Sequence, residues 1–348
     1  MITGPVLSSP LFTSDIPSLE LRLEPGAAGA RITITCHDTT VIDQYYYADT
    51  DGVIALYDID RLLADELRLA RRSNLLIEAT ADDGEQWASG LVDVIYCLAD
   101  TGTTCQAFID SHFLTTLDGP KMTAVGRTEL LSATGAASDT ATVKARYLTP
   151  GGLVVEREVE LLPQSENNGI YKYAVCPADY TNDSLGGLCA IDVSCGERSQ
   201  HFDVDPLQPD CAPVLLFINS FGCEELLYCT GEHQADPSYD RHTARIDMRR
   251  RNYSIIERRI FKADTGILTT AMASWADELL RSDEVYLWTD GRPGREVVIT
   301  ESKSERSSLA DEQPRFTFSY EYSQRIHNVM QPGREGRIFD NTFDSTFN

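Results

Sequence analysis

Short segments in which apolar and polar residues alternate run through most of this chain, and this pattern constrains its fold more than any other feature. Alternation with a period of two is typical of half-buried strands, because successive strand side chains point to opposite faces of a sheet. Gly, Pro, Asn and Asp separate the segments, as expected for turns. The predicted strands are Leu19–Leu23, Arg31–Cys36, Val41–Tyr47, Leu75–Thr80, Trp87–Leu98, Thr142–Leu148, Val154–Leu162, Tyr171–Cys176, Leu188–Cys195, Val214–Asn219, Glu225–Thr230, Ile255–Phe261, Glu284–Thr289, Glu296–Thr300 and Arg315–Tyr322. The pattern predicts a mainly β protein of tandem antiparallel β-sandwich or barrel-like domains with two short helices and an extended C-terminal tail.

The two predicted helices are the segments with helical spacing of apolar residues. The first covers residues 58–70, with Asp58 or Asp60 as the cap and an apolar face made of Leu62, Leu63, Leu67 and Leu69. The second covers residues 270–281, with Thr269 or Thr270 as the cap and an apolar face made of Met272, Trp275, Ala276, Leu279 and Leu280.

Two segments indicate domain boundaries. Residues 116–140 are rich in Thr, Ser, Gly and Ala, and residues 203–213 contain three prolines, which cannot donate to a central ladder. We therefore divide the chain near residues 115 and 210. The predicted parts are an N-terminal β domain with one helix (1–115), a middle β-sandwich (116–210), a C-terminal β domain with one helix (211–325) and a docking tail (326–348).

The charge of the chain is strongly negative, with 54 acidic and 30 basic side chains and a net charge of -24. Such a field repels nucleic acid and anionic membranes, so neither is an expected partner. No stretch approaches the 18 or so apolar residues that a membrane-spanning helix needs. The first residues lack a basic region followed by an apolar run, so we expect no secretory signal and assembly in a bacterial cytoplasm.

Residues 241–262 are an exception to this charge, because Asp247 and Glu257 are their only acids. Their basic residues are Arg241, Arg245, Arg249, Arg250, Arg251, Arg258, Arg259 and Lys262. Three interpretations remain open: a solvated strand pair with arginines on its outer face, a docking patch for an acidic neighbouring subunit, and a nucleic-acid contact. Arg249, Arg250 and Arg251 are the candidate docking residues in this segment.

The C-terminal segment 337–348 carries a phenylalanine at every fourth position, Phe339, Phe343 and Phe347, separated by Asp, Asn, Thr and Ser. A terminus is normally polar. The three rings therefore predict a groove that they fill, either on the same domain or on a neighbouring subunit.

Motifs for catalysis, cofactors or metals are absent from the sequence. It contains no phosphate loop, dinucleotide fingerprint, nucleophile elbow or HExxH helix. The nine cysteines include no CxxC pair, and Cys223, Cys229 and His233 do not have the spacing of a standard zinc site. We therefore predict no catalytic residue, no cofactor, no metal and no disulfide framework.

One segment resembles a known group of proteins. Residues 216–222, Leu-Phe-Ile-Asn-Ser-Phe-Gly, and the later Thr230-Gly231 are similar to virion structural proteins of phages and prophages of Bacteroidetes bacteria. The segments 263–266, 279–286 and 337–344 extend the similarity, which covers residues 213–348. The resemblance implies a tail, baseplate or connector-type component that works as a symmetric oligomer with copies of itself and other virion proteins.

These observations together predict a non-enzymatic structural component of a phage or prophage particle. Two alternatives remain open. A carbohydrate-binding or surface-adhesion β-sandwich protein would need an export route, and a glycan-degrading enzyme would need two carboxylates in an aromatic-lined cleft.

Overall fold

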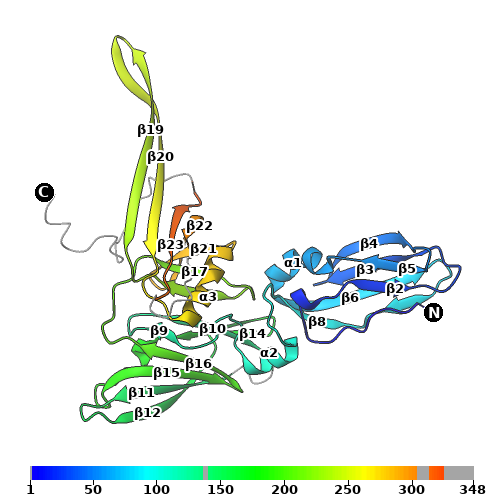
Figure 1. Ribbon diagram of the computed structural model, residues 1–348, viewed down its shortest axis with the longest axis horizontal. Coiled ribbons are helices and arrows are strands. Elements are labelled where there is room, and N and C mark those ends of the chain that lie inside the picture. Colours follow the sequence, from blue (N-terminus) through cyan, green and yellow to red (C-terminus); the bar gives the residue numbers. More distant parts are fainter. Residues whose placement is uncertain (1, 136–139, 304–312, 325–348) are drawn as a thin grey trace.

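The computed structural model describes residues 2–135, 140–303 and 313–324 and confirms a mainly β protein (Figure 1). Its strands form several sheets, mostly antiparallel, and three α-helices accompany them in the described part of the chain. The tail that contains Phe339, Phe343 and Phe347 lies outside the described residues, so its docking stays a prediction. The helices are α1 (Ile59–Ala70), α2 (Cys105–Ser111) and α3 (Thr270–Arg281).

Eight strands form the N-terminal sandwich. A six-stranded sheet with the order β1-β8-β6-β3-β4, in which β7 also pairs with β6, packs against the two-stranded sheet β2-β5. Buried side chains from both sheets, such as Leu21 and Ile32, share one core with α1. The strands are β1 (Leu11–Phe12), β2 (Leu19–Arg22), β3 (Gly29–Cys36), β4 (Thr39–Tyr47), β5 (Val53–Leu56), β6 (Arg72–Ala81), β7 (Gln86–Ala88) and β8 (Val92–Ile95).

The helix α1 has the predicted extent but a different apolar face. Its buried residues are Ile59, Leu63, Leu67 and Ala70, which lie on one side at helical spacing. Leu62 and Leu69, which we predicted to be buried, are 44% and 79% exposed. Asp58 occupies the N-cap position, but its side chain makes no capping hydrogen bond because its backbone is left-handed, with a φ of 57°.

A second sandwich follows in the middle of the chain. Its two sheets, β12-β11-β15-β16-β9 and β10-β14-β13, enclose a core that includes Val143, Ile191 and Tyr173. Residues 116–140, whose composition suggested a boundary, include β10, and all six residues of this strand are buried. The strands are β9 (Lys121–Thr123), β10 (Glu129–Thr134), β11 (Ala141–Leu148), β12 (Val154–Leu161), β13 (Ser165–Asn167), β14 (Ile170–Val175), β15 (Gly187–Cys195) and β16 (Arg198–Val204).

The C-terminal part is a single seven-stranded sheet with the order β18-β17-β21-β22-β23-β20-β19. Helix α3 covers one face and buries Trp275 completely, and Thr269 caps the helix as predicted by accepting a hydrogen bond from the Met272 amide. On the opposite face, Leu216 packs against Leu130 of β10. The strands are β17 (Val214–Ile218), β18 (Glu224–Tyr228), β19 (His233–Ile246), β20 (Arg249–Asp264), β21 (Val285–Thr289), β22 (Arg292–Lys303) and β23 (Thr317–Tyr322).

A cluster of aromatic rings joins the three parts. Phe12 comes from the N-terminal sandwich, Phe108 from α2, and Phe221 from the turn between β17 and β18, with ring centroids 5.2 to 5.8 Å apart. Asn219 fixes this turn, because its side-chain oxygen accepts hydrogen bonds from the Phe221 and Cys223 amides, each at 2.9 Å. The Asn-Ser-Phe-Gly segment, residues 219–222, therefore has a structural role where the three parts of the fold meet.

Buried polar groups also join the middle sandwich to the C-terminal sheet. Lys121 lies 2.7 Å from Glu129, donates to the Leu226 carbonyl at 2.9 Å, and lies 4.2 Å from the centroid of the Trp275 ring. Glu225 accepts a hydrogen bond from the Trp275 indole, and burial raises the pKa of its carboxyl. Because buried polar groups require such partners, the two parts are held in one relative arrangement.

Candidate interaction surface

The strands β19 and β20 form a long hairpin that projects from the body, and we call residues 233–264 the arm (Figure 1). The strands contain 14 and 16 residues, so at about 3.4 Å per residue the arm is about 45 Å long. Within the described ranges, only the base of the arm belongs to the larger sheet, because β23 pairs with β20 at Phe261–Asp264 and not further out. An isolated two-stranded ribbon is marginally stable in water, so the outer part of the arm is suited to pair with something else.

The turn at the tip holds two residues in left-handed backbone conformations. Asp247 and Met248 have φ values of 51° and 62°, which match a type I′ hairpin turn. Such turns favour Asn and Gly, and a left-handed conformation costs other residues on the order of 1 kcal/mol. Met248 is 85% exposed. The chain therefore accepts backbone strain to place a large apolar side chain at the outermost point of the arm.

Further apolar side chains are exposed along the arm. Tyr239, Tyr253, Ile255 and Ile256 are 43%, 68%, 55% and 57% exposed. Tyr253 is also the extra residue at a register shift, because His242 pairs with Ser254 and Thr243 with Asn252. Exposed apolar side chains that follow one another along a projecting element are typical of protein interaction sites.

The charges at the base of the arm are paired within the molecule. Arg258 donates two hydrogen bonds to Glu321 at 2.7 and 3.0 Å, and Arg259 pairs with Glu257 at 2.5 Å. Lys262 lies 3.8 Å from Asp236. These basic residues therefore fit the interpretation of a solvated strand pair with arginines on its outer face.

The outer part of the arm is different, because its arginines lack acidic partners in the described part of the chain. Arg245 lies directly opposite Arg250 in the register, a like-charge cross-strand pair that disfavours the free hairpin. The Arg250 guanidinium donates to the Thr243 hydroxyl at 3.1 Å. The predicted docking residues Arg249, Arg250 and Arg251 lie together at the tip, and all three are exposed. An acidic surface would relieve this repulsion.

The sequence predicted only Ile255–Phe261 as a strand in this region, and it missed β19 and most of the arm. Neither face of the outer arm is buried, so no alternation of apolar and polar residues marks its strands. The tip also lacks a turn signal, because Asp247-Met248 does not contain the Asn-Gly or Asp-Gly pair that type I′ turns favour.

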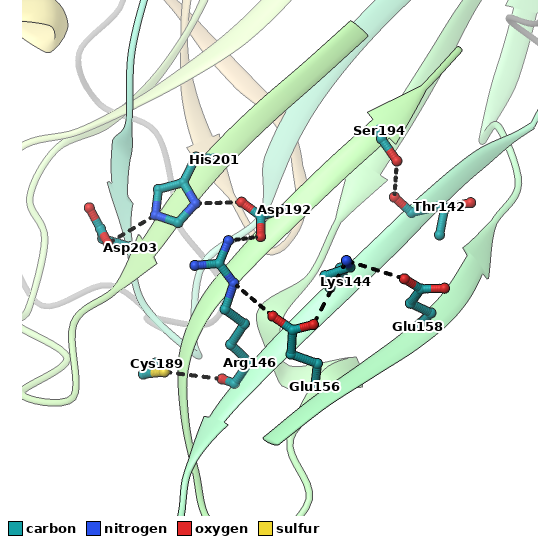
Figure 2. A network of polar contacts seen from close by, with 10 residues as sticks. All are labelled: Thr142, Lys144, Arg146, Glu156, Glu158, Cys189, Asp192, Ser194, His201 and Asp203. Carbon is teal, nitrogen blue, oxygen red and sulfur yellow. Dashed lines mark hydrogen bonds and ion pairs between the residues drawn. The ribbon is translucent and has the colours of Figure 1, made fainter. Parts of the chain in front are cut away.

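A second polar cluster covers the outer face of the middle sandwich, where Figure 2 shows ion pairs that cross four neighbouring strands. Lys144 lies 3.4 Å from Glu158, and His201 places its two ring nitrogens 2.6 Å from Asp192 and 3.1 Å from Asp203. Burial lowers the pKa of His201, but the bonds to both aspartates outweigh it and raise that pKa above its ordinary value. With both nitrogens bonded, this histidine stabilises the sheet face and is not placed as a general base.

A cavity of about 450 Å³ lies between the N-terminal sandwich and the C-terminal sheet. Arg68 pairs across it with Asp283 and Glu284, each at 3.1 Å, and Glu278 accepts hydrogen bonds from the backbone and hydroxyl of Ser220. Another cavity of about 410 Å³ lies at the base of the arm. Because Arg68 bonds across the larger of these two cavities to Asp283 and Glu284, this cavity is a seam between two parts of the fold.

Metal ligands do not gather anywhere in the described residues: no group of three or more His, Cys, Asp or Glu side chains is placed to hold an ion. All nine cysteines are free thiols, and six of them are buried. No helix in the described ranges is long and apolar enough to cross a membrane.

Comparisons with known proteins identify no family. No family model matches the chain, and no curated protein matches it. Among solved structures, the chain is similar to fibronectin(III)-like modules of CbhA from Clostridium thermocellum, with 10% sequence identity and a TM-score of 0.18. That match covers 59% of this chain and 94% of the other. A TM-score this low supports no conclusion about function.

Proposed function

We propose that this protein is a non-enzymatic structural subunit that assembles into a symmetric oligomer through its arm. The observation that carries the proposal is the arm itself, a ribbon that projects beyond the sheet and exposes both arginines and apolar side chains. No described residue outside the hairpin pairs with its outer part, and the hairpin contains opposed like charges, a combination that does not stabilise a monomer. In an assembly, a neighbouring subunit supplies the missing packing and the opposite charge.

The proposed particle is a phage or phage-like particle, in which the chain serves as a tail, baseplate or connector-type component together with other virion proteins. This part of the proposal is supported by the resemblance of residues 213–348 to virion structural proteins. The resembling segments 216–222 and 279–286 build the turn, helix end and strand that support the C-terminal sheet. These two segments therefore belong to the body from which the arm projects.

The proposal is tested by shortening the arm without disturbing its base. Replacing residues 239–257 with Asn-Gly joins Ser238 to Arg258, which are cross-strand partners, through a two-residue turn. The ion pair between Arg258 and Glu321 is retained. We expect the full chain to form oligomers in light scattering and electron microscopy, and the shortened chain to remain folded and monomeric.

Two results would overturn the proposal. The shortened chain could assemble to the same size as the full chain, or the full chain could remain monomeric up to high concentration. Either result would favour the alternatives, a carbohydrate-binding or surface-adhesion protein or a glycan-degrading enzyme.

A further inference from the structure

The strand β12 is an unpaired edge at the far side of the middle sandwich. Among the described residues it pairs only with β11, and it forms one end of the five-stranded sheet. All eight of its residues are exposed or half-buried. An exposed edge strand leaves a row of backbone N–H and C=O groups that another strand can pair with.

The charges of β12 select what can pair with it. Glu156, Glu158 and Glu160 stand at alternate positions, so they lie on the same face of the strand. Lys144 contacts Glu158 at 3.4 Å and Glu156 at 3.8 Å, and Arg146 contacts Glu156 at 3.7 Å. Glu160 lies opposite the neutral Thr142 and has no ion pair among the described residues, so the row keeps a net negative charge. Three like charges in a row disfavour pairing of β12 with another β12, and they favour a strand that carries positive charges at the same spacing.

The arm provides such a strand. Arg249 and Arg251 stand at alternate positions on β20, and both are exposed without an acidic partner among the described residues. Both the arm and β12 also expose large apolar side chains. Met248 at the tip is 85% exposed, and Leu153 and Val154 at the start of β12 are 71% and 57% exposed.

The arm and β12 lie at opposite ends of the molecule, as Figure 1 shows, so they cannot meet within one copy. We propose that the arm of one copy pairs with the β12 edge of a neighbouring copy and extends its sheet by strand addition. The two surfaces differ, so the contact is head-to-tail and generates a closed ring or a helical stack. This inference rests on the proposed function and names the acceptor surface for the arm.

Two charge-reversed chains test the pairing. The arm-reversed chain carries Arg249→Glu and Arg251→Glu, and the acceptor-reversed chain carries Glu158→Arg and Glu160→Arg. Each chain alone opposes like charges at the contact, so we expect each to lose assembly at concentrations where the unmodified chain assembles. In an equimolar mixture, copies of the two chains that alternate along the assembly meet opposite charges at every contact. We therefore expect the mixture to assemble, and to reach the original size in an open stack or in a ring with an even number of copies. Light scattering measures both results.

Controls separate loss of pairing from loss of folding. The control chain carries Glu20→Arg and Glu78→Arg, at exposed strand positions of the N-terminal sandwich. Its net charge changes as much as that of the acceptor-reversed chain, and we expect it to assemble normally. The single variant Glu160→Arg removes no intramolecular ion pair of the described residues, and we expect it to weaken assembly without lowering the melting temperature.

The outcomes distinguish this inference from the function on which it rests. If the acceptor-reversed chain assembles normally, or if the mixture stays monomeric, β12 is not the acceptor. Should the shortened arm still abolish assembly in that case, the proposed function stands and only the acceptor is wrong. Assembly of the shortened chain overturns both.

Discussion

Replacing Met248 with glycine separates the folding of the arm from its binding. In the folded chain, glycine relieves the strain of the φ of 62°, on the order of 1 kcal/mol. In the unfolded chain, glycine adds conformational entropy that costs about 0.5–1 kcal/mol. The two terms offset each other, so we expect the free energy of unfolding to change by less than about 1 kcal/mol.

Binding responds differently, because the variant removes a side chain that is 85% exposed in the free chain. Burying a methionine side chain at an interface contributes about 1.5–3 kcal/mol. At about 1.4 kcal/mol per factor of ten, we expect Met248→Gly to weaken association roughly 10- to 100-fold. A dilution series in analytical ultracentrifugation measures the association constant, and thermal unfolding measures stability.

The matched control is Leu207→Ser, which removes an equally exposed apolar side chain, 86% exposed, from the loop between β16 and β17. We expect this variant to associate as the unmodified chain does. An unchanged association constant for Met248→Gly would show that this side chain is not part of the contact between copies.

Two further predictions concern the body. Lys121→Met leaves the buried carboxylate of Glu129 without its cation, so we expect a loss of about 3–5 kcal/mol in a denaturant titration. Adding Glu129→Leu should recover part of this loss, because the Leu226 carbonyl also loses its bond to Lys121. Because the pKa of His201 is raised above 6.5 in the folded chain, its stabilisation is complete below about pH 6.5 and is lost as the pH rises through the folded pKa. We therefore expect His201→Gln to reduce the dependence of the melting temperature on pH between pH 6 and 8. An unchanged dependence would contradict the stabilisation of protonated His201 by Asp192 and Asp203.

The parts of the fold that could be predicted from the sequence are those with one buried face. In β11, buried Val143 and Ala145 alternate with half-buried Lys144 and Arg146, and the predicted strand Thr142–Leu148 nearly matches the observed one. The strand β10 was missed because both of its faces are buried and it includes Ser132 and Thr134, so alternation is absent. Helix α2, with seven residues, is too short to show a helical period.

The candidate surface could be predicted only in part. The cluster Arg249–Arg251 stood out by charge, but its position at the tip of a projecting hairpin depends on pairing between β19 and β20. The acceptor edge was predicted as an ordinary strand, because nothing in the sequence of residues 154–162 says that it would end a sheet. Edge position is a property of the sheet order, which the local pattern does not encode.

Cryo-electron microscopy of the oligomers that the full chain forms shows whether the arm joins neighbouring copies. We expect rings or helical stacks in which density for the arm of each copy continues the five-stranded sheet of its neighbour beside β12. Particles with the arm free in solvent, or monomers alone at high concentration, would contradict this expectation.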